Sequence, residues 1–271
     1  MILQMNRKIG LIIMNVLAVG LFLLSCSGIR QNQPNSAVQF IVIVPTAEKE
    51  AEVVYNLINN IAFFDENEYN ISLPNVPLIN SLKSKVYKGM NLNKNDLDEL
   101  EILFKNELFN EKDYEISLTA VQKAALMANQ YLDIFHIYAQ KWDFFIPPQY
   151  NITLSLYGPG GSYNPSNGDI SMKISKDGTF FVEPLSNMLH EAFHIGIENS
   201  IIQRYNVSHK TKERIVDQFM YLKMREVIPN YQMQTGTDTS IDIIFQDNDV
   251  FENFPERIKI FIEKNSREQE N

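Results

Sequence analysis

The pentapeptide His190-Glu191-Ala192-Phe193-His194 is the most informative stretch of this sequence. Two histidines four positions apart on a helix project from one face, one turn above the other, so their imidazole nitrogens can converge on a single metal ion. Zinc suits such a pair because it binds neutral imidazole and carboxylate in a tetrahedral shell. A catalytic zinc keeps three protein ligands and leaves its fourth position for water. The stretch therefore predicts a helical zinc site that needs one more protein ligand.

The residues around the pentapeptide predict a helix over residues 184–199. Pro184 is suited to the first turn, where its missing N–H costs no hydrogen bond. A stripe of apolar and small residues has the spacing of a core-facing side, with the histidines on a neighbouring face: Leu185, Leu189, Ala192, Phe193 and Gly196. The motif alone leaves open a buried helix whose histidines only form hydrogen bonds.

Glu191 is the predicted general base. It follows His190 by one position, so it emerges more than a quarter turn round the helix, beside the metal rather than on it. Zinc lowers the pKa of a bound water towards neutrality, and a nearby carboxylate can take its proton during attack on a peptide carbonyl. The same carboxyl can then pass that proton to the leaving amine.

The third ligand is predicted to be Glu213, nineteen positions after His194. Ser208 or Thr211 could cap a new helix that runs to about residue 225. Glu213 and Asp217 are four positions apart and share a face of that helix. We expect Asp217 to accept the hydrogen bond that fixes the tautomer of a ligating histidine. The alternative is a solvated, charged helix face.

Other polar residues compete for roles at this site. Glu198 lies four positions after His194, although a straight helix would carry it a full turn past the metal. His209 could reach in from the connecting loop as a ligand or as a donor to the developing oxyanion. Tyr221 and Tyr231 are further candidates for stabilising the tetrahedral intermediate, and the sequence does not choose among them.

These residues resemble the gluzincin group of zinc metallopeptidases, to which the thermolysin-like and aminopeptidase N-like enzymes belong. The gap between His194 and Glu213 is similar to the aminopeptidase spacing, and Glu213-x-x-x-Asp217 is similar to the second thermolysin-like motif. The resemblance implies that His190, His194 and Glu213 bind one Zn²⁺, that Glu191 is the base, and that Asp217 supports a ligand.

The resemblance covers about residues 150–225 and also implies a fold. The chain lacks a Gly-x-Met-Glu-Asn element and an Asn-Glu-Ala context around Glu213, so it resembles a small, divergent gluzincin, an endopeptidase rather than an exopeptidase. The implied fold is α+β and zincin-like, with a small mixed sheet, the HExxH helix and a helical C-terminal part. The last strand before that helix is expected at the sheet edge over the cleft, where residues 160–165 could line the substrate site.

The amino terminus predicts export. Arg7 and Lys8 precede an apolar run over residues 9–24, which is typical of a secretory signal peptide. Leu23-Leu24-Ser25-Cys26 resembles the lipobox of bacterial lipoproteins, and Cys26 is the only cysteine. We therefore expect a signal peptide over residues 1–25 and a lipid anchor on Cys26, with the protein at the periplasmic side or the cell surface. An ordinary cleaved signal or an uncleaved membrane helix is the alternative.

Charge limits the partners. Removal of residues 1–25 takes away Arg7 and Lys8, so the mature chain carries 22 − 33 = −11 from the 24 basic and 33 acidic residues of the whole sequence. Such an excess argues against nucleic acid and against anionic lipid headgroups, so the acyl group would hold the protein at the membrane. Residues 26–36 are rich in Gln, Asn and Ser, which predicts a flexible tether.

The rest of the chain divides into a supporting region, residues 37–116, and a metallopeptidase core, residues 117–271. The first region carries no chemistry that the sequence identifies. Hydrophobic periodicity predicts strands at residues 38–45, 152–157 and 170–175, and helices at residues 47–64, 95–108, 117–142 and 254–263, with loops over most of residues 65–93.

The sequence thus predicts a lipid-anchored zinc endopeptidase that acts on a peptide or protein substrate. The alternative is a non-catalytic binding or scaffold lipoprotein that retains the fold around a structural zinc. The intact Glu191 argues against the alternative, because a purely structural metal needs no base. A closed shell of four protein ligands would favour the structural role, and an open position facing a cleft would favour catalysis.

Overall fold

The computed structural model describes residues 38–247 and 249–269. The predicted signal peptide, the tether and the Cys26 anchor lie outside these described residues. The described residues from Val38 onwards form one compact unit, which contains both the supporting region and the predicted core. No helix in the described part of the chain has the length and apolar character required to cross a bilayer.

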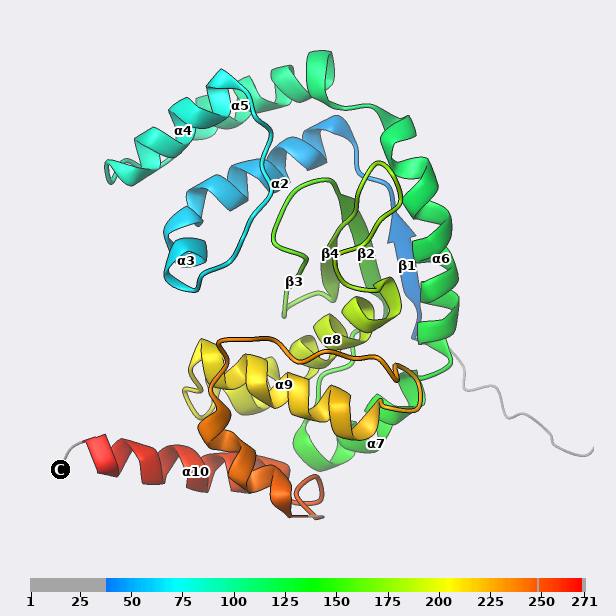
Figure 1. The fold of residues 1–271 in the computed structure, drawn as a ribbon, viewed down its shortest axis with the longest axis vertical. Coiled ribbons are helices and arrows are strands. Elements are labelled where there is room, and N and C mark those ends of the chain that lie inside the picture. The colour runs from blue at the N-terminus through cyan, green and yellow to red at the C-terminus, as the bar shows by residue number, and fades with distance from the viewer. Residues whose placement is uncertain (1–37, 248, 270–271) are drawn as a thin grey trace, which may run out of the picture. The chain divides into compact units, whose positions relative to one another are not determined.

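A sheet of four strands lies among the helices (Figure 1). The strands are β1 (Phe40–Ile43), β2 (Tyr150–Ser155), β3 (Gly161–Tyr163) and β4 (Asp169–Lys173). Their order is β1-β2-β4-β3, with β1, β2 and β4 parallel and β3 antiparallel to β4. Apolar residues alternate along the strands, so Ile152 and Leu154 are fully buried in the core, as is Ile170. The α+β class and the small mixed sheet are therefore confirmed.

The prediction that the last strand before the HExxH helix lies at the sheet edge is wrong. Residues 170–175 contain most of β4, which pairs on both sides and lies inside the sheet. The edge is β3, a three-residue strand within residues 160–165, the stretch expected to line the substrate site. Gly158 adopts a φ of 116°, which suits glycine, and Gly160 accepts a hydrogen bond from Lys173, so the chain folds back onto β4.

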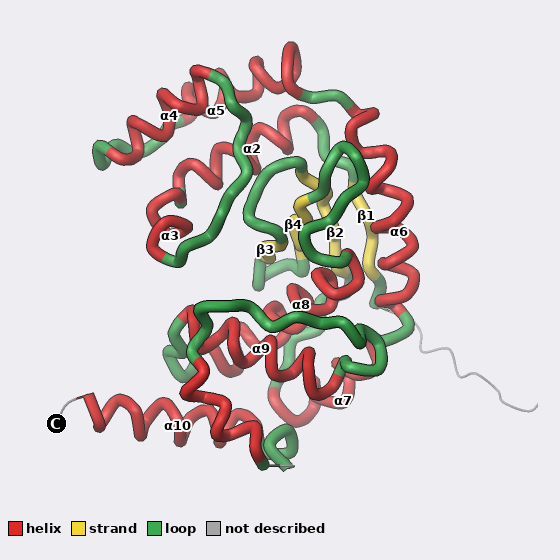
Figure 2. The backbone as a smooth tube through the Cα atoms, viewed as in Figure 1, coloured by secondary structure: helices red, strands yellow, loops and turns green. Residues whose placement is uncertain are grey.

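Nine α-helices surround the sheet in the described chain (Figure 2). They are α2 (Ala47–Asn59), α3 (Ile61–Glu66), α4 (Pro77–Tyr87), α5 (Lys94–Leu103), α6 (Glu115–Asn129), α7 (Leu132–Trp142), α8 (Pro184–Ile197), α9 (His209–Lys223) and α10 (Phe254–Gln269). Short π-helical stretches follow α5 (Phe104–Leu108) and α8 (Glu198–Gln203), and 3-10 helices occupy Glu111–Tyr114 and Thr239–Gln246.

Two of these helices differ from the predicted pattern for physical reasons. The helix expected over residues 117–142 is broken after Asn129, whose side-chain oxygen accepts the Phe40 backbone N–H of β1 at 2.7 Å. Helix α6 therefore ends beside β1, and α7 begins at Leu132. The stretch expected to be mostly loop contains α4, which starts at Pro77, a residue suited to a first helical turn.

The helices enclose two hydrophobic cores. The larger core joins the sheet to α6, α7, α8, α9 and α10, and the smaller one lies among α2, α4 and α5. Glu50 of α2 connects the two, because its Oε1 accepts the Tyr114 hydroxyl at 2.7 Å and the Leu156 N–H at 2.8 Å. The N-terminal region is thus built into the same structure as the predicted core, to which it contributes β1.

Candidate metal centre

Helix α8 places the HExxH pentapeptide in the interior. Pro184 occupies its first turn, and every residue from 186 to 197 is buried. Gly196 permits this depth, because a Cβ at this position would lie 1.9 Å from the Phe144 ring. A helix that is buried all round can hold two imidazoles rigidly, since neither ring has room to turn.

Helix α9 brings the third predicted ligand to the same place. Its N-cap is Ser208, whose hydroxyl accepts the Thr211 N–H at 3.2 Å. Phe193 of α8 and Phe219 of α9 stack with ring centroids 3.8 Å apart and an interplanar angle of 15°. This contact fixes the two helices against each other, and Glu213 is buried at their interface with 7% of its surface exposed.

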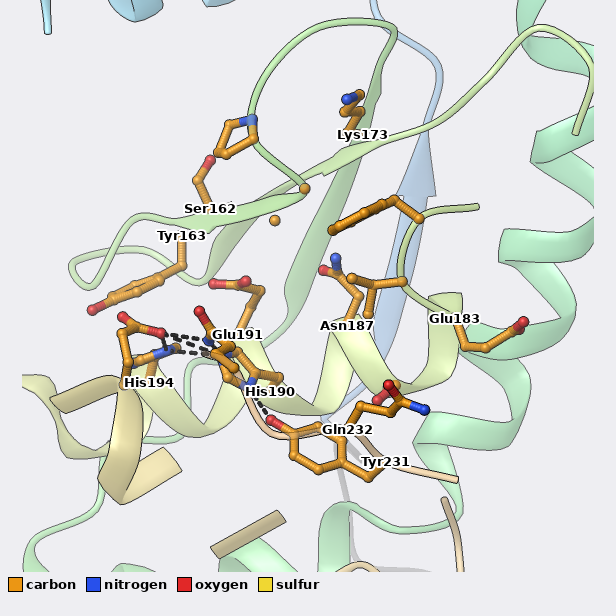
Figure 3. Close-up of a pocket in the computed structure, with 18 of the residues that line it drawn as sticks. Ser162, Tyr163, Lys173, Glu183, Asn187, His190, Glu191, His194, Tyr231 and Gln232 are labelled. Carbon is orange, nitrogen blue, oxygen red and sulfur yellow. Dashed lines mark hydrogen bonds and ion pairs between the residues drawn. The ribbon is translucent and has the colours of Figure 1, made fainter. Parts of the chain in front are cut away.

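The three predicted ligands meet at one point. Figure 3 shows His190 and His194 side by side at this point. The Nε2 atoms of His190 and His194 are 3.0 Å apart, and Glu213 Oε2 lies 3.2 Å from the second and 3.6 Å from the first. Tetrahedral zinc with bonds of about 2.0–2.1 Å has ligand-to-ligand edges of roughly 3.3–3.4 Å. The buried His-His-Glu group therefore has the dimensions of a metal site and could hold a metal ion.

The protonation states of two ligands fit a cation. Burial lowers the pKa of His194 to about 4, so its ring is neutral at pH 7. Burial alone would raise the pKa of Glu213, but the two imidazoles beside it outweigh that effect and hold the pKa well below its usual range. A neutral imidazole and an ionised carboxylate are the forms that bind metal without first losing a proton.

Tyr231 sets the orientation of His190. Its hydroxyl donates to Asp217 Oδ1 at 2.6 Å and lies 2.7 Å from His190 Nδ1. Since the hydroxyl proton is given to Asp217, the same oxygen accepts the Nδ1–H of the imidazole, which leaves the Nε2 lone pair directed at the ligand group. The sequence predicted a direct hydrogen bond between Asp217 and a ligating histidine. In the structure Asp217 instead supports His190 through Tyr231. Because its hydroxyl bonds to Asp217 and His190, Tyr231 does not offer its proton to a substrate carbonyl.

Tyr163 of β3 covers His194. The two rings are parallel within 8°, with centroids 4.9 Å apart. The Tyr163 hydroxyl donates to Glu198 Oε2 at 2.6 Å and accepts from Lys212 at 3.0 Å. Glu198, the first competitor for the third ligand position, is therefore paired outside the ligand group. Nδ1 of His194 has no hydrogen-bond partner among the described residues, so stacking is the main restraint on this ring.

The remaining sequence candidates lie outside the ligand group. His209 Nε2 is 2.8 Å from the Tyr69 hydroxyl, and its Nδ1 is 3.7 Å from Glu213 Oε1, whereas the contacts of Glu213 with His190 and His194 involve Oε2. His209 therefore borders the site without joining it. Tyr221 is 41% exposed and is not among the residues that line the cleft.

Glu191 is buried beside the ligand group and close to β3 (Figure 3). Burial raises its pKa to about 7, against the lowering effect of His190. Gly161 provides the necessary room, because a Cβ there would lie 2.2 Å from Glu191 Oε1 and 2.7 Å from Asn187 Oδ1. The backbone of the edge strand therefore passes directly against this carboxyl group.

A cleft of about 1850 Å³ opens onto the site, and His190, Glu191, His194 and Glu213 all line it. It is bordered by β3, by residues 180–187, and by residues 228–237. Three aromatic residues of the N-terminal region that the sequence analysis did not single out also line it: Phe63, Phe64 and Tyr69. These aromatics belong to no motif, and only the fold brings them to the cleft.

No protein-family model, curated protein or solved structure matches the chain. The function must therefore be inferred from the site itself. That site is a buried His-His-Glu group that could hold a metal ion, next to a buried glutamate, at the wall of a large cleft.

Proposed function

We propose that this protein is a zinc-dependent endopeptidase with a zincin-like arrangement of sheet edge and HExxH helix. The observation that carries the proposal is the convergence of His190, His194 and Glu213 beside Glu191 in one cleft. Two imidazoles and one carboxylate are a donor set that suits zinc, whereas calcium and magnesium prefer oxygen ligands. A zinc ion held there would polarise the scissile carbonyl and make a water molecule more acidic.

Glu191 supplies the proton transfers. Its carboxylate takes a proton from the water whose oxygen forms the new bond to the carbonyl carbon. The resulting carboxylic acid then gives the proton to the amine nitrogen as the C–N bond breaks. A pKa near 7 favours both transfers, because the group can accept and return a proton at little cost near neutral pH.

The edge strand offers a place for an extended peptide. The backbone N–H of Lys173 donates to the Gly160 carbonyl at 2.7 Å, and the backbone N–H of Asn164 donates to the Asp169 carbonyl at 2.8 Å. In an antiparallel ladder the bonded pairs alternate, so the backbone groups of Gly161 and Tyr163 point away from β4 towards the free edge. A substrate strand can bond to them in the manner of β-augmentation.

The course of the cleft supports internal cleavage. Its lining includes Glu183 and Pro184 at the start of α8 and Glu198 just beyond the end of α8. It therefore extends past the ligand group in both directions along this helix. A long peptide can occupy such a cleft with its termini outside. We further propose that the enzyme is exported and held at a bacterial membrane through Cys26, as the amino-terminal sequence predicts.

The direct test replaces Glu191 by Gln. The amide keeps the size of the side chain but cannot shuttle a proton, so hydrolysis of a protein or fluorogenic peptide substrate should fall by roughly 10²–10⁴-fold while zinc content stays unchanged. Glu226→Gln is the matched control, since it changes an exposed glutamate outside the cleft and should retain activity. Equal activity in wild type and Glu191→Gln would refute the proposed function.

A further inference from the structure

Gln234 extends its side chain into the ligand group. Its Nε2 lies 2.8 Å from Glu213 Oε2 and 3.3 Å from His190 Nε2. The distances between the three ligand atoms are similar, at 3.0, 3.2 and 3.6 Å. If the ligand atoms of His190, His194 and Glu213 occupy three corners of a tetrahedron, the Gln234 carboxamide lies near the fourth corner.

This placement is built into the chain on both sides of Gln234. The Gln234 backbone N–H donates to Asp217 Oδ2 at 2.8 Å, while Tyr231 bonds to the other oxygen of the same carboxylate. Further along, the Asp238 carboxylate accepts the Thr211 hydroxyl at 2.7 Å. Residues 231–238, which we call the return segment, are thus tied along α9, and the fully buried Asp217 anchors them beside the metal centre.

The chemistry of the carboxamide allows a ligand role. In the arrangement described, the NH₂ end donates towards the carboxylate and the imidazole. A half turn about the last side-chain bond exchanges this NH₂ for the oxygen, which is an acceptor with lone pairs. When a cation occupies the His-His-Glu group, the oxygen end is the favourable one, because the positive charge repels the amide hydrogens and attracts the oxygen.

We propose that Gln234 is the fourth ligand of the metal in the resting protein, through Oε1, and that a substrate carbonyl displaces it. The proposal rests on the proposed metal centre. The two imidazoles and the carboxylate are the stronger ligands, whereas a single neutral amide is weak. A peptide carbonyl is the same kind of ligand, so the exchange replaces one amide oxygen by another and costs little. Because a substrate displaces Gln234, this shell opens when a peptide binds, unlike the permanently closed shell of a structural metal.

Two opposite substitutions test this role, with Co²⁺ as the probe because its visible absorption reports the ligand set. Gln234→Ala replaces the amide by water, so the Co²⁺ spectrum should change, Co²⁺ affinity should fall by roughly tenfold or more, and KM for a peptide should decrease. Gln234→Glu supplies a charged ligand that a substrate does not displace, so metal affinity should rise and hydrolysis should fall at least tenfold. Gln232→Ala changes an exposed neighbour in the same segment and should keep the wild-type Co²⁺ spectrum and affinity.

The outcomes separate this proposal from the proposed function. Identical Co²⁺ spectra and affinities in wild type and Gln234→Ala overturn the ligand role. An unchanged spectrum with a tenfold lower kcat would also overturn it, and would instead make Gln234 a hydrogen-bond donor to the reacting carbonyl. If the spectrum depends on Gln234 but no peptide is cleaved, the ligand role stands and the peptidase proposal fails. If wild type binds no Co²⁺, both fail.

Discussion

At the residue scale, Gly161 is the point where the edge strand meets the proposed base. A methyl group at this position would collide with Glu191 Oε1. Gly161→Ala should therefore displace the carboxyl group, lower kcat/KM at least tenfold, and cost about 1–3 kcal/mol of stability, while zinc content remains unchanged. Steady-state kinetics and elemental analysis on the same preparation check this.

The adjacent glycine provides the control for this substitution. Gly160 has no atom within 4 Å of the Cβ it would gain, and its φ lies outside the left-handed region. Gly160→Ala should therefore keep both activity and stability close to wild type. Equal kcat/KM values in the two variants would show that contact between β3 and Glu191 does not matter for catalysis.

Some residues of the site could be predicted from the sequence and others could not. His190, Glu191 and His194 are spaced by the periodicity of one helix, which is a local property, whereas Glu213 lies on the next predicted helix; the fold brings all four to one cleft. The residues that surround them follow no local pattern: Tyr69, Tyr163, Tyr231 and Gln234. Asp217 was expected to bond a histidine directly, and the error arose because Tyr231 enters from a distant irregular segment.

At the scale of elements, the site depends on the packing of α8 against α9. Phe193 and Phe219 stack between them, and Phe219 is fully buried. Phe219→Ala should lower the free energy of unfolding by about 3–5 kcal/mol through loss of buried surface and a residual cavity. It should also weaken zinc binding, since Glu213 lies on the loosened helix. Urea unfolding and zinc titration measure the two effects.

Leu222 is the matched control on the same helix. It is 43% exposed, so Leu222→Ala should change stability by only about 0.5 kcal/mol, as surface substitutions usually do. Zinc affinity should remain at the wild-type value. A similar loss of zinc affinity in both variants would mean that the aromatic stack does not position Glu213.

Helices with a strong apolar stripe were predicted well, and short or interrupted elements were not. Helix α8 begins at the predicted Pro184 and α9 follows the predicted cap at Ser208. Helix α6 ends at Asn129, which bonds to Phe40, 89 positions away, and no local pattern contains such a contact. Strand β3 has only three residues and lies next to glycines, so its sequence has too few positions to show alternation.

At the scale of the whole molecule, Glu50 links the N-terminal helices to the sheet and should make stability depend on pH. Burial raises its pKa above the ordinary 4.5, although bonds from Leu156 and Tyr114 oppose the rise. The folded state therefore retains a proton that the unfolded chain has released. The contribution of Glu50 to the free energy of unfolding should therefore fall as pH rises from about 4.5 through the raised pKa.

Glu50→Gln removes this titration because the amide stays neutral. Wild type should lose stability relative to the variant as pH rises, as measured by urea unfolding at several pH values. Glu52→Gln, on the exposed side of the same helix, should follow the wild-type curve. Parallel curves for wild type and Glu50→Gln would contradict the role given to burial.

The N-terminal region also shows why long-range structure escaped the sequence analysis. It was predicted to be a supporting region in which the sequence identifies no chemistry. In the structure it supplies β1 to the sheet, and Tyr69 lies 2.8 Å from His209 beside Glu213. Both contacts join segments more than 100 positions apart, so hydrophobic periodicity within a window of residues carries no information about them.

The most direct measurement is the zinc content of the purified protein after dialysis against metal-free buffer, compared with that of Glu213→Gln. Glu213 is the ligand that α9 must bring to the two histidines of α8, so its loss tests the convergence itself. We predict about one zinc per chain in wild type and less than about a tenth of that in the variant, because one charged ligand of three is lost. Equal zinc in both proteins, or none in either, would contradict a metal centre formed by His190, His194 and Glu213.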